Sequence, residues 1–293
     1  MNKFEYLTPA TIDEAISFCI SHGERAKYIA GGTDVMVKLK EGKISPQYLV
    51  SLRRIQGLDH IVYKNGELRI GSLATHRMLE LSPVIRKEFP ILMDAVTNIG
   101  SVQIRNVATI GGNIINAVPS ADGAIPLITL GAQVRLRGPK GERSIALEHI
   151  FIGPGMTLLE PGEILLEFIV PKLPPNTGAA YSKHTRRAAM ELPLLGVAVL
   201  LSLGDDRITC TEARIGLGVL APTPMRARSA EAILRGKKVS DELLKKAGKA
   251  AAEECKARDS IRGEAWYRRE MVEVLVPRMA RLAMERARQE EVR

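Results

Sequence analysis

The chain has 293 residues, of which 45% are hydrophobic, so it has enough apolar material for two or three domains with cores of their own. Its three cysteines, Cys19, Cys210 and Cys255, lie far apart, which argues against a disulfide framework or an iron–sulfur site and suits a reducing cytoplasm. The net charge is +9, no apolar run reaches the roughly 18 residues of a membrane span, and the opening MNKFEYLTPA lacks a signal-peptide core.

The N-terminal stretch predicts a small α/β unit that ends near residue 57. Thr11 and Glu14 have the spacing of a capping box, apolar residues follow at helical spacing, and Gly23 ends the helix. We expect Asp34 to cap the next helix with its side chain, since a carboxylate there would repel a phosphate. The expected elements are a helix over 11–22, a strand over 26–30, a helix over 35–40 and a strand over 47–52.

The middle of the chain predicts a mixed, mostly antiparallel sheet with helices on one side. Asn65-Gly66 between two apolar runs is a strong hairpin signal, and Gly138–Gly141 indicates a second hairpin. The expected strands cover 61–64, 67–71, 133–137, 143–147 and 164–170, and the expected helices cover 75–81 and 90–99.

A linker with three prolines, at 171–178, precedes the last third of the chain. Strands are expected at 197–203 and 208–217. Ser240 is expected to begin a helix, and a second, longer helix with one apolar face is expected after it, despite Pro277. The predicted fold is therefore α+β, with boundaries at 1–57, 58–174 and 175–293, the last range being an antiparallel sheet packed with a helix bundle.

The positive charge is concentrated toward the C-terminus and raises nucleic acid as a partner. Residues 226–293 hold 18 Lys and Arg against 12 Asp and Glu, and 18 − 12 gives +6. The signs are interleaved, however, and Trp266 and Tyr267 are the only aromatic residues there, so a stacking platform is absent. We interpret these charges as solvated helix faces or a subunit contact rather than a nucleic-acid site.

Two glycine pairs, Gly31-Gly32 and Gly111-Gly112, each follow an apolar run. A pyrophosphate needs several backbone N–H groups pointing at it, and glycine allows a close backbone approach and a positive φ. The pairs therefore suggest two clamps on one phosphate-bearing ligand. The alternative is that each pair forms an ordinary turn or bulge.

The sequence offers no nucleophile–base pair and no metal-ligand spacing, so we expect neither catalytic residues nor a metal site. The histidines are scattered, and we expect each to be exposed or hydrogen-bonded; they are His22, His60, His76, His149 and His184.

With their flanks, the glycine pairs resemble the two FAD-binding motifs of the flavin subunits of molybdenum hydroxylases, as AGGTD at 30–34 and IRNVATIGGNI at 104–114. That family includes the medium subunit of carbon monoxide dehydrogenase and the flavin domain of xanthine dehydrogenase. The resemblance covers nearly the whole chain, through PSAD at 119–122, EILLEFIVP at 163–171, CTEARIGLGVLAPTPMRA at 210–227 and WYRREMVEVLVPR at 266–278.

The resemblance implies a set of cofactor-binding positions. The first FAD loop would be Ala30, Gly31, Gly32, Thr33 and Asp34, and the second Thr109, Ile110, Gly111, Gly112 and Asn113. Ser120 and Asp122 match positions that contact the pyrophosphate and ribitol region, Leu165 a position that packs on the flavin ring, and Lys183 a basic position near the ring. The alternatives are that Asp122 caps a helix over 123–130, that Leu165 is an ordinary inward strand leucine, and that Lys183 is solvated.

Two departures bear on these implied roles. Some family members place a tyrosine against the flavin where this chain has Met190-Glu191-Leu192-Pro193, so the electron acceptor is left open. The cysteine-bearing insertion that marks the 4-hydroxybenzoyl-CoA reductases is absent.

The function implied by the resemblance is that of a cytoplasmic flavoprotein relay. FAD would be bound without a covalent link, since neither glycine segment contains a histidine or cysteine. Electrons would come from [2Fe–2S] clusters of a small subunit, after hydroxylation of a substrate at the molybdenum cofactor of a large subunit, and pass to NAD or another acceptor. The expected assembly is a dimer of heterotrimers. The alternatives are a stand-alone oxidoreductase with the FAD fold of the vanillyl-alcohol oxidases, and a flavin-free assembly or interaction subunit.

Overall fold

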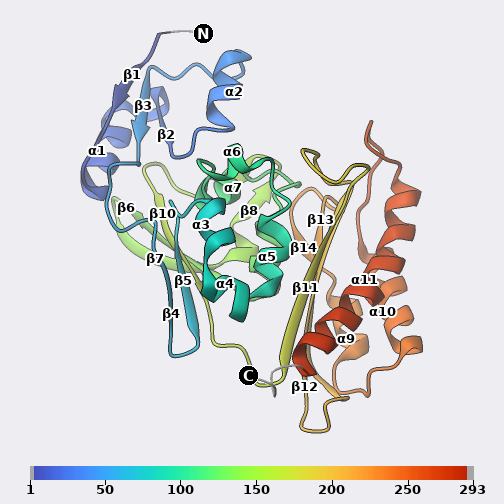
Figure 1. The fold of residues 1–293 in the computed structure, drawn as a ribbon. Helices are drawn as coiled ribbons and strands as arrows, with labels where there is room; N and C mark the ends of the chain where they lie inside the picture. Colours follow the sequence, from blue (N-terminus) through green and yellow to red (C-terminus); the bar gives the residue numbers. More distant parts are fainter. Residues whose placement is uncertain (1–2, 289–293) are drawn as a thin grey trace.

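Sheets of three, five and four strands, with a two-stranded ribbon and several helices, make up the computed structural model of the chain, which describes residues 3–288 (Figure 1). The α+β class expected from the sequence is confirmed. Among the described residues, no helix combines the length and apolarity that crossing a membrane requires.

The N-terminal unit is a parallel sheet in the order β1-β3-β2. The Thr11 cap is confirmed, because the Glu14 N–H donates to Thr11 Oγ1 (3.2 Å), and Gly23 ends the helix with φ +57°. The Glu14 side chain reaches back to the Ala10 N–H (2.8 Å) rather than to that of Thr11, so the reciprocal bond of a capping box is displaced by one residue. Asp34 precedes α2 but makes no capping hydrogen bond, so that expectation is wrong; its own backbone is already helical, whereas a capping side chain needs an extended one. The elements are β1 (Glu5–Leu7), α1 (Ile12–His22), η1 (Gly23–Arg25), β2 (Ala26–Ile29), α2 (Val35–Lys40) and β3 (Tyr48–Ser51).

The five-stranded sheet has the order β4-β5-β10-β6-β7 and is antiparallel throughout, not mixed. Asn65 (φ 54°) and Gly66 (φ 83°) form the predicted tight hairpin, since both residues of such a turn need positive φ. The strands are β4 (Ile61–Lys64), β5 (Glu67–Gly71), β6 (Gln133–Gly138), β7 (Gly141–Ala146) and β10 (Ile164–Val170).

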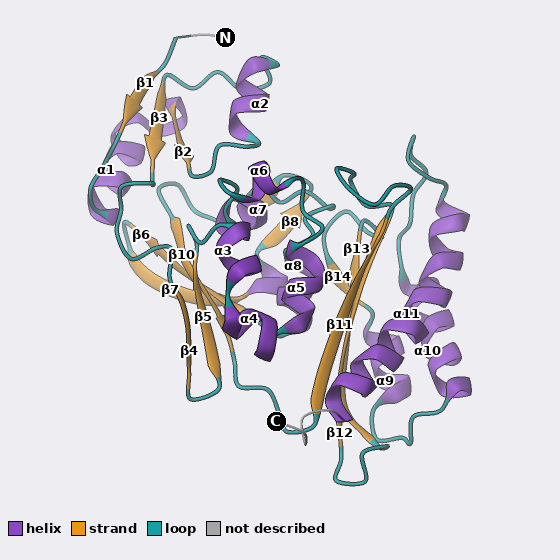
Figure 2. Cartoon of the chain, viewed as in Figure 1, coloured by secondary structure: helices purple, strands orange, loops and turns teal. Residues whose placement is uncertain are grey.

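A layer of short helices lies between this sheet and the C-terminal sheet (Figure 2). The sequence did not predict α4, which begins at Pro83 with Ser82 as its cap. The glycine pair at 111–112 was expected in a loop and lies instead in α7. The layer contains α3 (His76–Leu81), α4 (Pro83–Glu88), α5 (Pro90–Val96), α6 (Val102–Arg105), α7 (Ile110–Ile115) and α8 (Ala124–Thr129); η2 (Leu147–His149) and the ribbon β8 (Phe151–Gly153) and β9 (Met156–Thr157) follow β7.

The C-terminal sheet has the order β11-β12-β13-β14, and α9, α10 and α11 cover its outer face (Figure 1). The strands expected at 197–203 and 208–217 are present as β12 and β13, which pair antiparallel, but the sequence did not predict β11, which begins within the expected linker. The elements are β11 (Thr177–His184), β12 (Leu195–Leu203), β13 (Cys210–Gly218), β14 (Met225–Arg226), α9 (Arg228–Leu234), α10 (Asp241–Glu254) and α11 (Ala265–Arg288).

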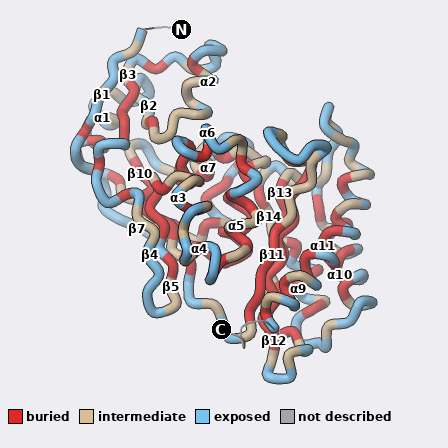
Figure 3. The backbone as a smooth tube through the Cα atoms, in the orientation of Figure 1, coloured by how far each residue is buried: buried red, intermediate tan, exposed pale blue. Residues whose placement is uncertain are grey.

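β12 is buried along its whole length and separates two hydrophobic cores (Figure 3). Ala198 and Leu200 face the core of the helical layer, whereas Val197 and Val199 face the core beneath α9–α11. This alternation follows from the two-residue period of a strand and buries both faces of the sheet. The division into 1–57, 58–174 and 175–293 stays a prediction, and residues 289–293 lie outside the described part.

Candidate functional site

The two glycine segments lie directly against each other, although they are far apart in the sequence. Gly31 follows β2 and faces the backbone of residues 107–108, and a Cβ at Gly31 would overlap the carbonyl oxygen of Val107. Gly32 has φ +77°, a conformation that a side chain strains. Glycine at these two positions therefore permits the close contact between the first segment and the stretch leading to Thr109.

The first segment holds a row of backbone N–H groups without protein acceptors. Within residues 3–288, none of the N–H groups from Gly31 to Asp34 donates a hydrogen bond. Gly31, Gly32 and Thr33 are half-buried and Asp34 is exposed. Successive N–H groups of this kind form a concave site for an anion. We call this row, Gly31–Asp34, the N–H cradle.

The second glycine pair is built differently. The N–H groups of Ile110 and Gly111 donate to the carbonyl oxygens of Ala74 (3.0 Å) and Ser72 (2.9 Å), and that of Gly112 donates to Thr109 Oγ1 (3.1 Å). Gly111 has no positive φ, but a Cβ there would lie 2.5 Å from the Ser72 oxygen. The expectation that both pairs offer free N–H groups is therefore wrong for the second pair, in which glycine permits close packing.

A small pocket opens beside the second segment, where Thr75 and Thr109 form an antiparallel bridge. Each threonine caps a helix, since Thr75 Oγ1 accepts from Met78 N–H (3.1 Å) and Thr109 Oγ1 from Gly112 N–H. The pocket has a volume of about 160 Å³ and gives room next to Thr109 for part of a ligand. Its lining comprises Arg53, Ile55, Asp59, Leu73, Thr75, Met78, Val107 and Thr109.

A buried arginine anchors the approach to this segment. Arg105 donates through Nε and Nη2 to both carboxylate oxygens of Glu80 (2.9 and 3.2 Å) and through Nη1 to the Ile99 carbonyl (3.0 Å). This fork-like pairing fixes the chain immediately before the glycine pair. Arg105 lies within the IRNVATIGGNI motif, but its role could not be predicted from the sequence because its partner, Glu80, lies on a different helix.

His76 is one buried histidine that contradicts the expectation of an exposed or hydrogen-bonded ring. It is 1% exposed, and neither ring nitrogen has a partner among the described residues. Burial, with a smaller effect from the Arg105 charge, lowers the pKa of His76 from 6.5 to about 4. The ring is therefore neutral at physiological pH.

Asp122 links the helical layer to the C-terminal sheet. Its carboxylate accepts from the Tyr181 hydroxyl (2.8 Å) and from Lys183 Nζ (2.8 Å), which also donates to the Asn98 carbonyl (2.9 Å). Burial raises the pKa of the Asp122 carboxyl, and the Lys183 charge and the two hydrogen bonds oppose that rise. Asp122 therefore does not cap α8, and Lys183 is not solvated, so both alternative interpretations are wrong.

Three further predicted site residues are Asn113, Ser120 and Leu165. Asn113 Oδ1 accepts from the Gly123 N–H (3.2 Å), which joins α7 to the segment containing Ser120. Ser120 is half-buried, and its hydroxyl has no partner among residues 3–288. Leu165 is 4% exposed in the core of the helical layer, as expected of an inward strand leucine. Its packing on a flavin ring stays a prediction, as do the other cofactor contacts.

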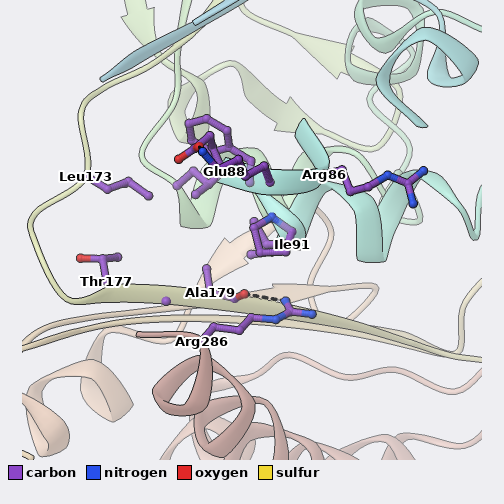
Figure 4. Close-up of a pocket in the computed structure, with 12 residues that line it drawn as sticks. Arg86, Glu88, Ile91, Leu173, Thr177, Ala179 and Arg286 are labelled. Atoms are coloured by element: carbon purple, nitrogen blue, oxygen red, sulfur yellow. Dashed lines mark hydrogen bonds and ion pairs between the residues drawn. The ribbon is translucent and has the colours of Figure 1, made fainter. Parts of the chain in front are cut away.

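A larger pocket, of about 390 Å³, lies between α4–α5 and the start of β11 and contains none of the predicted site residues (Figure 4). Arg286 in its wall donates to the Ala179 carbonyl (2.7 Å) and pairs with Asp94 (2.6 Å). Because this guanidinium already has acceptors in the protein, it is not available to hold an anion, and we do not place the site there.

Two family models together match most of the chain. The model of the FAD binding domain in molybdopterin dehydrogenase matches residues 2–173, and that of the CO dehydrogenase flavoprotein C-terminal domain matches residues 179–283.

Comparisons with individual proteins point to the same family. The carbon monoxide dehydrogenase medium chain of Hydrogenophaga pseudoflava is 32% identical over 284 residues, which cover 97% of this chain and 98% of the relative. The xanthine dehydrogenase FAD-binding subunit of Escherichia coli is 31% identical over 276 residues, 94% of each chain. The solved carbon monoxide dehydrogenase from H. pseudoflava that lacks the Mo-pyranopterin moiety superposes with a TM-score of 0.93 at 33% identity, covering 97% of this chain and 98% of that one.

Proposed function

The chain belongs to the FAD-binding medium subunits of the molybdopterin dehydrogenases, and from this premise we propose that it is the electron relay of such a complex. In this proposal, a small partner subunit delivers electrons from its [2Fe–2S] clusters, and a large partner subunit with the molybdenum cofactor hydroxylates the substrate. FAD, when bound, would supply the electron-transfer chemistry, with NAD or another molecule as the acceptor. The complex is proposed to be a dimer of heterotrimers.

The observation that carries the proposal is the N–H cradle, Gly31–Asp34. Its N–H groups have no acceptor in the described protein, and Gly31 keeps the cradle against the second segment. A pyrophosphate fits this donor set, because its oxygens are anionic hydrogen-bond acceptors. The unpartnered Ser120 hydroxyl supports the same assignment. The Asp34 carboxylate is exposed and is expected to point away from the phosphates.

At the other end of the proposed site, Lys183 and Asp122 would hold the region around the flavin ring. A cation there favours negative charge on a bound group. Because Asp122 already pairs with Lys183 at 2.8 Å, we propose that the pair mainly fixes the position of the ammonium group and offers only part of its charge. Leu165 would contribute an apolar surface.

The proposal is tested by expressing the chain alone, reconstituting it with FAD and assaying purines, N-heterocycles, aldehydes and carbon monoxide with a dye acceptor. We expect no turnover by the chain alone, and turnover after the small and large subunits are added. Robust turnover by the chain alone would favour a stand-alone oxidoreductase. A folded chain that takes up no FAD would favour the flavin-free alternative.

A further inference from the structure

Two loops at one end of the C-terminal sheet expose unusually large apolar side chains. The first loop, 185–194, joins β11 to β12, and the second, 255–264, leads into α11 (Figure 1). Ile261 is 94% exposed and Trp266, at the start of α11, is 61% exposed; Met190 and Leu192 on the first loop are 55% and 47% exposed. Exposed apolar groups of this size are a liability unless another molecule covers them.

The two loops form one surface because a buried arginine holds them together. Arg268 is 2% exposed and donates to the Leu194 carbonyl, at the end of the first loop, and to Ser260 Oγ (2.8 Å) in the second. A Cβ at Gly263 would lie 3.2 Å from the Leu194 side chain, so the loops also touch directly. We call Met190, Leu192, Arg258, Ile261, Arg262 and Trp266 the two-loop surface.

The two-loop surface carries positive charge without matching carboxylates. Arg258 and Arg262 are exposed, and neither forms an ion pair among residues 3–288. Burial, and then the charges of these two arginines, lower the pKa of Arg268. Like charges gathered in this way favour an acidic partner.

The nearby carboxylates are occupied within their own loops. Asp259 accepts from the Ala265 N–H (2.6 Å), Glu264 from the Trp266 indole, and Glu191 from backbone N–H groups of residues 186–187. These contacts hold the loops in shape, and Glu191 also pairs with Arg186 (3.2 Å). The three carboxylates keep their charge, but within residues 3–288 none of them forms an ion pair with Arg258 or Arg262.

A row of contacts links the two-loop surface to the end of β11 that also carries Lys183. The rings of Trp266 and Tyr267 are in edge contact, with centroids 5.8 Å apart, and Tyr267 is hydrogen-bonded to His184 Nε2 (3.0 Å). The next residue along β11 is Lys183, which pairs with Asp122. Lys183 and His184 face opposite sides of the sheet, because side chains alternate along a strand, but both lie at the end of β11 from which the first loop begins. A partner seated on the two-loop surface would therefore lie at the same end of β11 as the proposed ring end of the site.

We propose that the two-loop surface docks an acidic partner subunit of the complex, the one that delivers electrons to this chain. Its contact face would carry apolar side chains that cover Ile261 and Trp266, surrounded by carboxylates that face Arg258 and Arg262. The inference rests on the proposed function for the identity of the partner. The apolar centre with a charged edge is the usual arrangement of a stable protein interface.

The first test is assembly of the full chain co-expressed with the other subunits of its complex. We expect Ile261→Glu/Trp266→Glu to weaken binding of the iron–sulfur subunit at least about tenfold. The matched control is Val62→Glu/Ile152→Glu, which adds the same charges at apolar side chains 46% and 54% exposed on other strands. Assembly is measured by analytical ultracentrifugation, and FAD content is measured in the same samples.

The charge is tested separately with Arg258→Glu/Arg262→Glu, for which Lys237→Glu/Lys238→Glu in the exposed turn after α9 is the control. We expect slower association for the arginine variant only, and a smaller dependence of its association rate on salt. Equal effects of both variants would contradict a localised acidic partner.

The partner is identified by a photo-crosslinker attached to Ile261→Cys in the assembled complex. The expected product joins this chain to an acidic segment of the iron–sulfur subunit. Crosslinks only to a second copy of this chain, only to the molybdenum subunit or to no protein would overturn the inference. Normal assembly of the folded, FAD-loaded Ile261→Glu/Trp266→Glu variant would also overturn the inference, and it would leave the proposed function intact. Absence of FAD from the unmodified chain would instead contradict the proposed function.

Discussion

Lys183 Nζ and the carboxylate of Asp122 lie 2.8 Å apart, and each side chain is only 7% exposed. The pair joins the segment between α7 and α8, which contains Asp122, to β11, an edge strand of the C-terminal sheet. Tyr181, two residues earlier on β11, donates to the same carboxylate. The pair is therefore both a structural connection between the two halves of the molecule and part of the proposed cofactor site.

Replacing Lys183 with methionine is expected to lower the free energy of unfolding by about 3–5 kcal/mol near neutral pH, because it leaves a buried carboxylate without its cation. Burial already raises the pKa of Asp122, and the substitution removes an opposing effect. A carboxyl with a raised folded pKa contributes stability below its unfolded pKa of 3.8 and loses it as the pH rises through the folded pKa.

The loss in Lys183→Met is therefore expected to grow as the pH is raised from about 4 to about 8, which urea unfolding at several pH values measures. Lys246→Met is the control, since its ion pair with Glu242 is exposed. A loss of stability that is independent of pH, or one no larger than in the control, would contradict the claim that Lys183 compensates the charge of the buried Asp122 carboxylate.

The neighbouring glycines 111 and 112 are expected to respond differently to the same methyl group. Gly111→Ala places a Cβ 2.5 Å from the Ser72 carbonyl oxygen and is expected to cost about 1–3 kcal/mol of unfolding free energy. Gly112→Ala meets only Thr109 Oγ1, at 3.0 Å, and is expected to change stability by less than about 1 kcal/mol. Thermal and urea unfolding of both variants measure the difference, and equal destabilisation would contradict the packing role of Gly111.

Gly32→Val is expected to abolish retention of FAD while the C-terminal domain stays folded. The variant strains a residue with φ +77° and presses its Cβ against the side chains of Ile29 (3.3 Å) and Met36 (3.5 Å), which distorts the N–H cradle, and we expect an affinity loss of roughly three orders of magnitude. Gly42→Val is a matched control, because Gly42 has φ +71° and open space around its Cβ position. Isothermal titration with FAD measures both affinities, and stoichiometric FAD in Gly32→Val would show that the segment is only a turn.

His76 is expected to destabilise the protein at acidic pH. A group with a depressed folded pKa contributes stability above its unfolded pKa and loses it as the pH falls toward the folded pKa. For His76 this window runs from 6.5 to about 4, which corresponds to about 3 kcal/mol. His76→Leu is expected to lose this pH dependence, measured by urea unfolding between those limits. His149→Leu, which changes a side chain that is 70% exposed, is expected to retain it; an unchanged pH dependence in His76→Leu would contradict the burial of a neutral ring.

Features with local causes could be predicted from the sequence. The capping hydrogen bond of Thr11 and the turn at Asn65-Gly66 depend on residues only a few positions apart, and both are present. The helix of the second glycine pair was missed because isolated glycines favour a loop. In the structure α7 is held by Thr109 as its cap and by hydrogen bonds to residues 72–74.

Features with distant causes could not be predicted. β1 has only three residues, and its parallel pairing with β3 depends on a strand more than forty positions away in the sequence rather than on a local pattern. The Lys183–Asp122 pair has the same origin, since the fold brings together residues that no local pattern links. The resemblance identified both residues as candidates, but their burial and mutual contact follow from tertiary structure. The free N–H groups of Gly31–Asp34, by contrast, agree with the sequence-based interpretation of the first glycine pair.

The most direct test of FAD binding is acid precipitation of the purified full chain after reconstitution with FAD and removal of the excess. The proposed site predicts one FAD per chain, released entirely into the supernatant, because neither glycine segment contains a histidine or cysteine for covalent attachment. Flavin that stays with the pellet would contradict the non-covalent site, and folded protein that retains no flavin would contradict FAD binding by this chain.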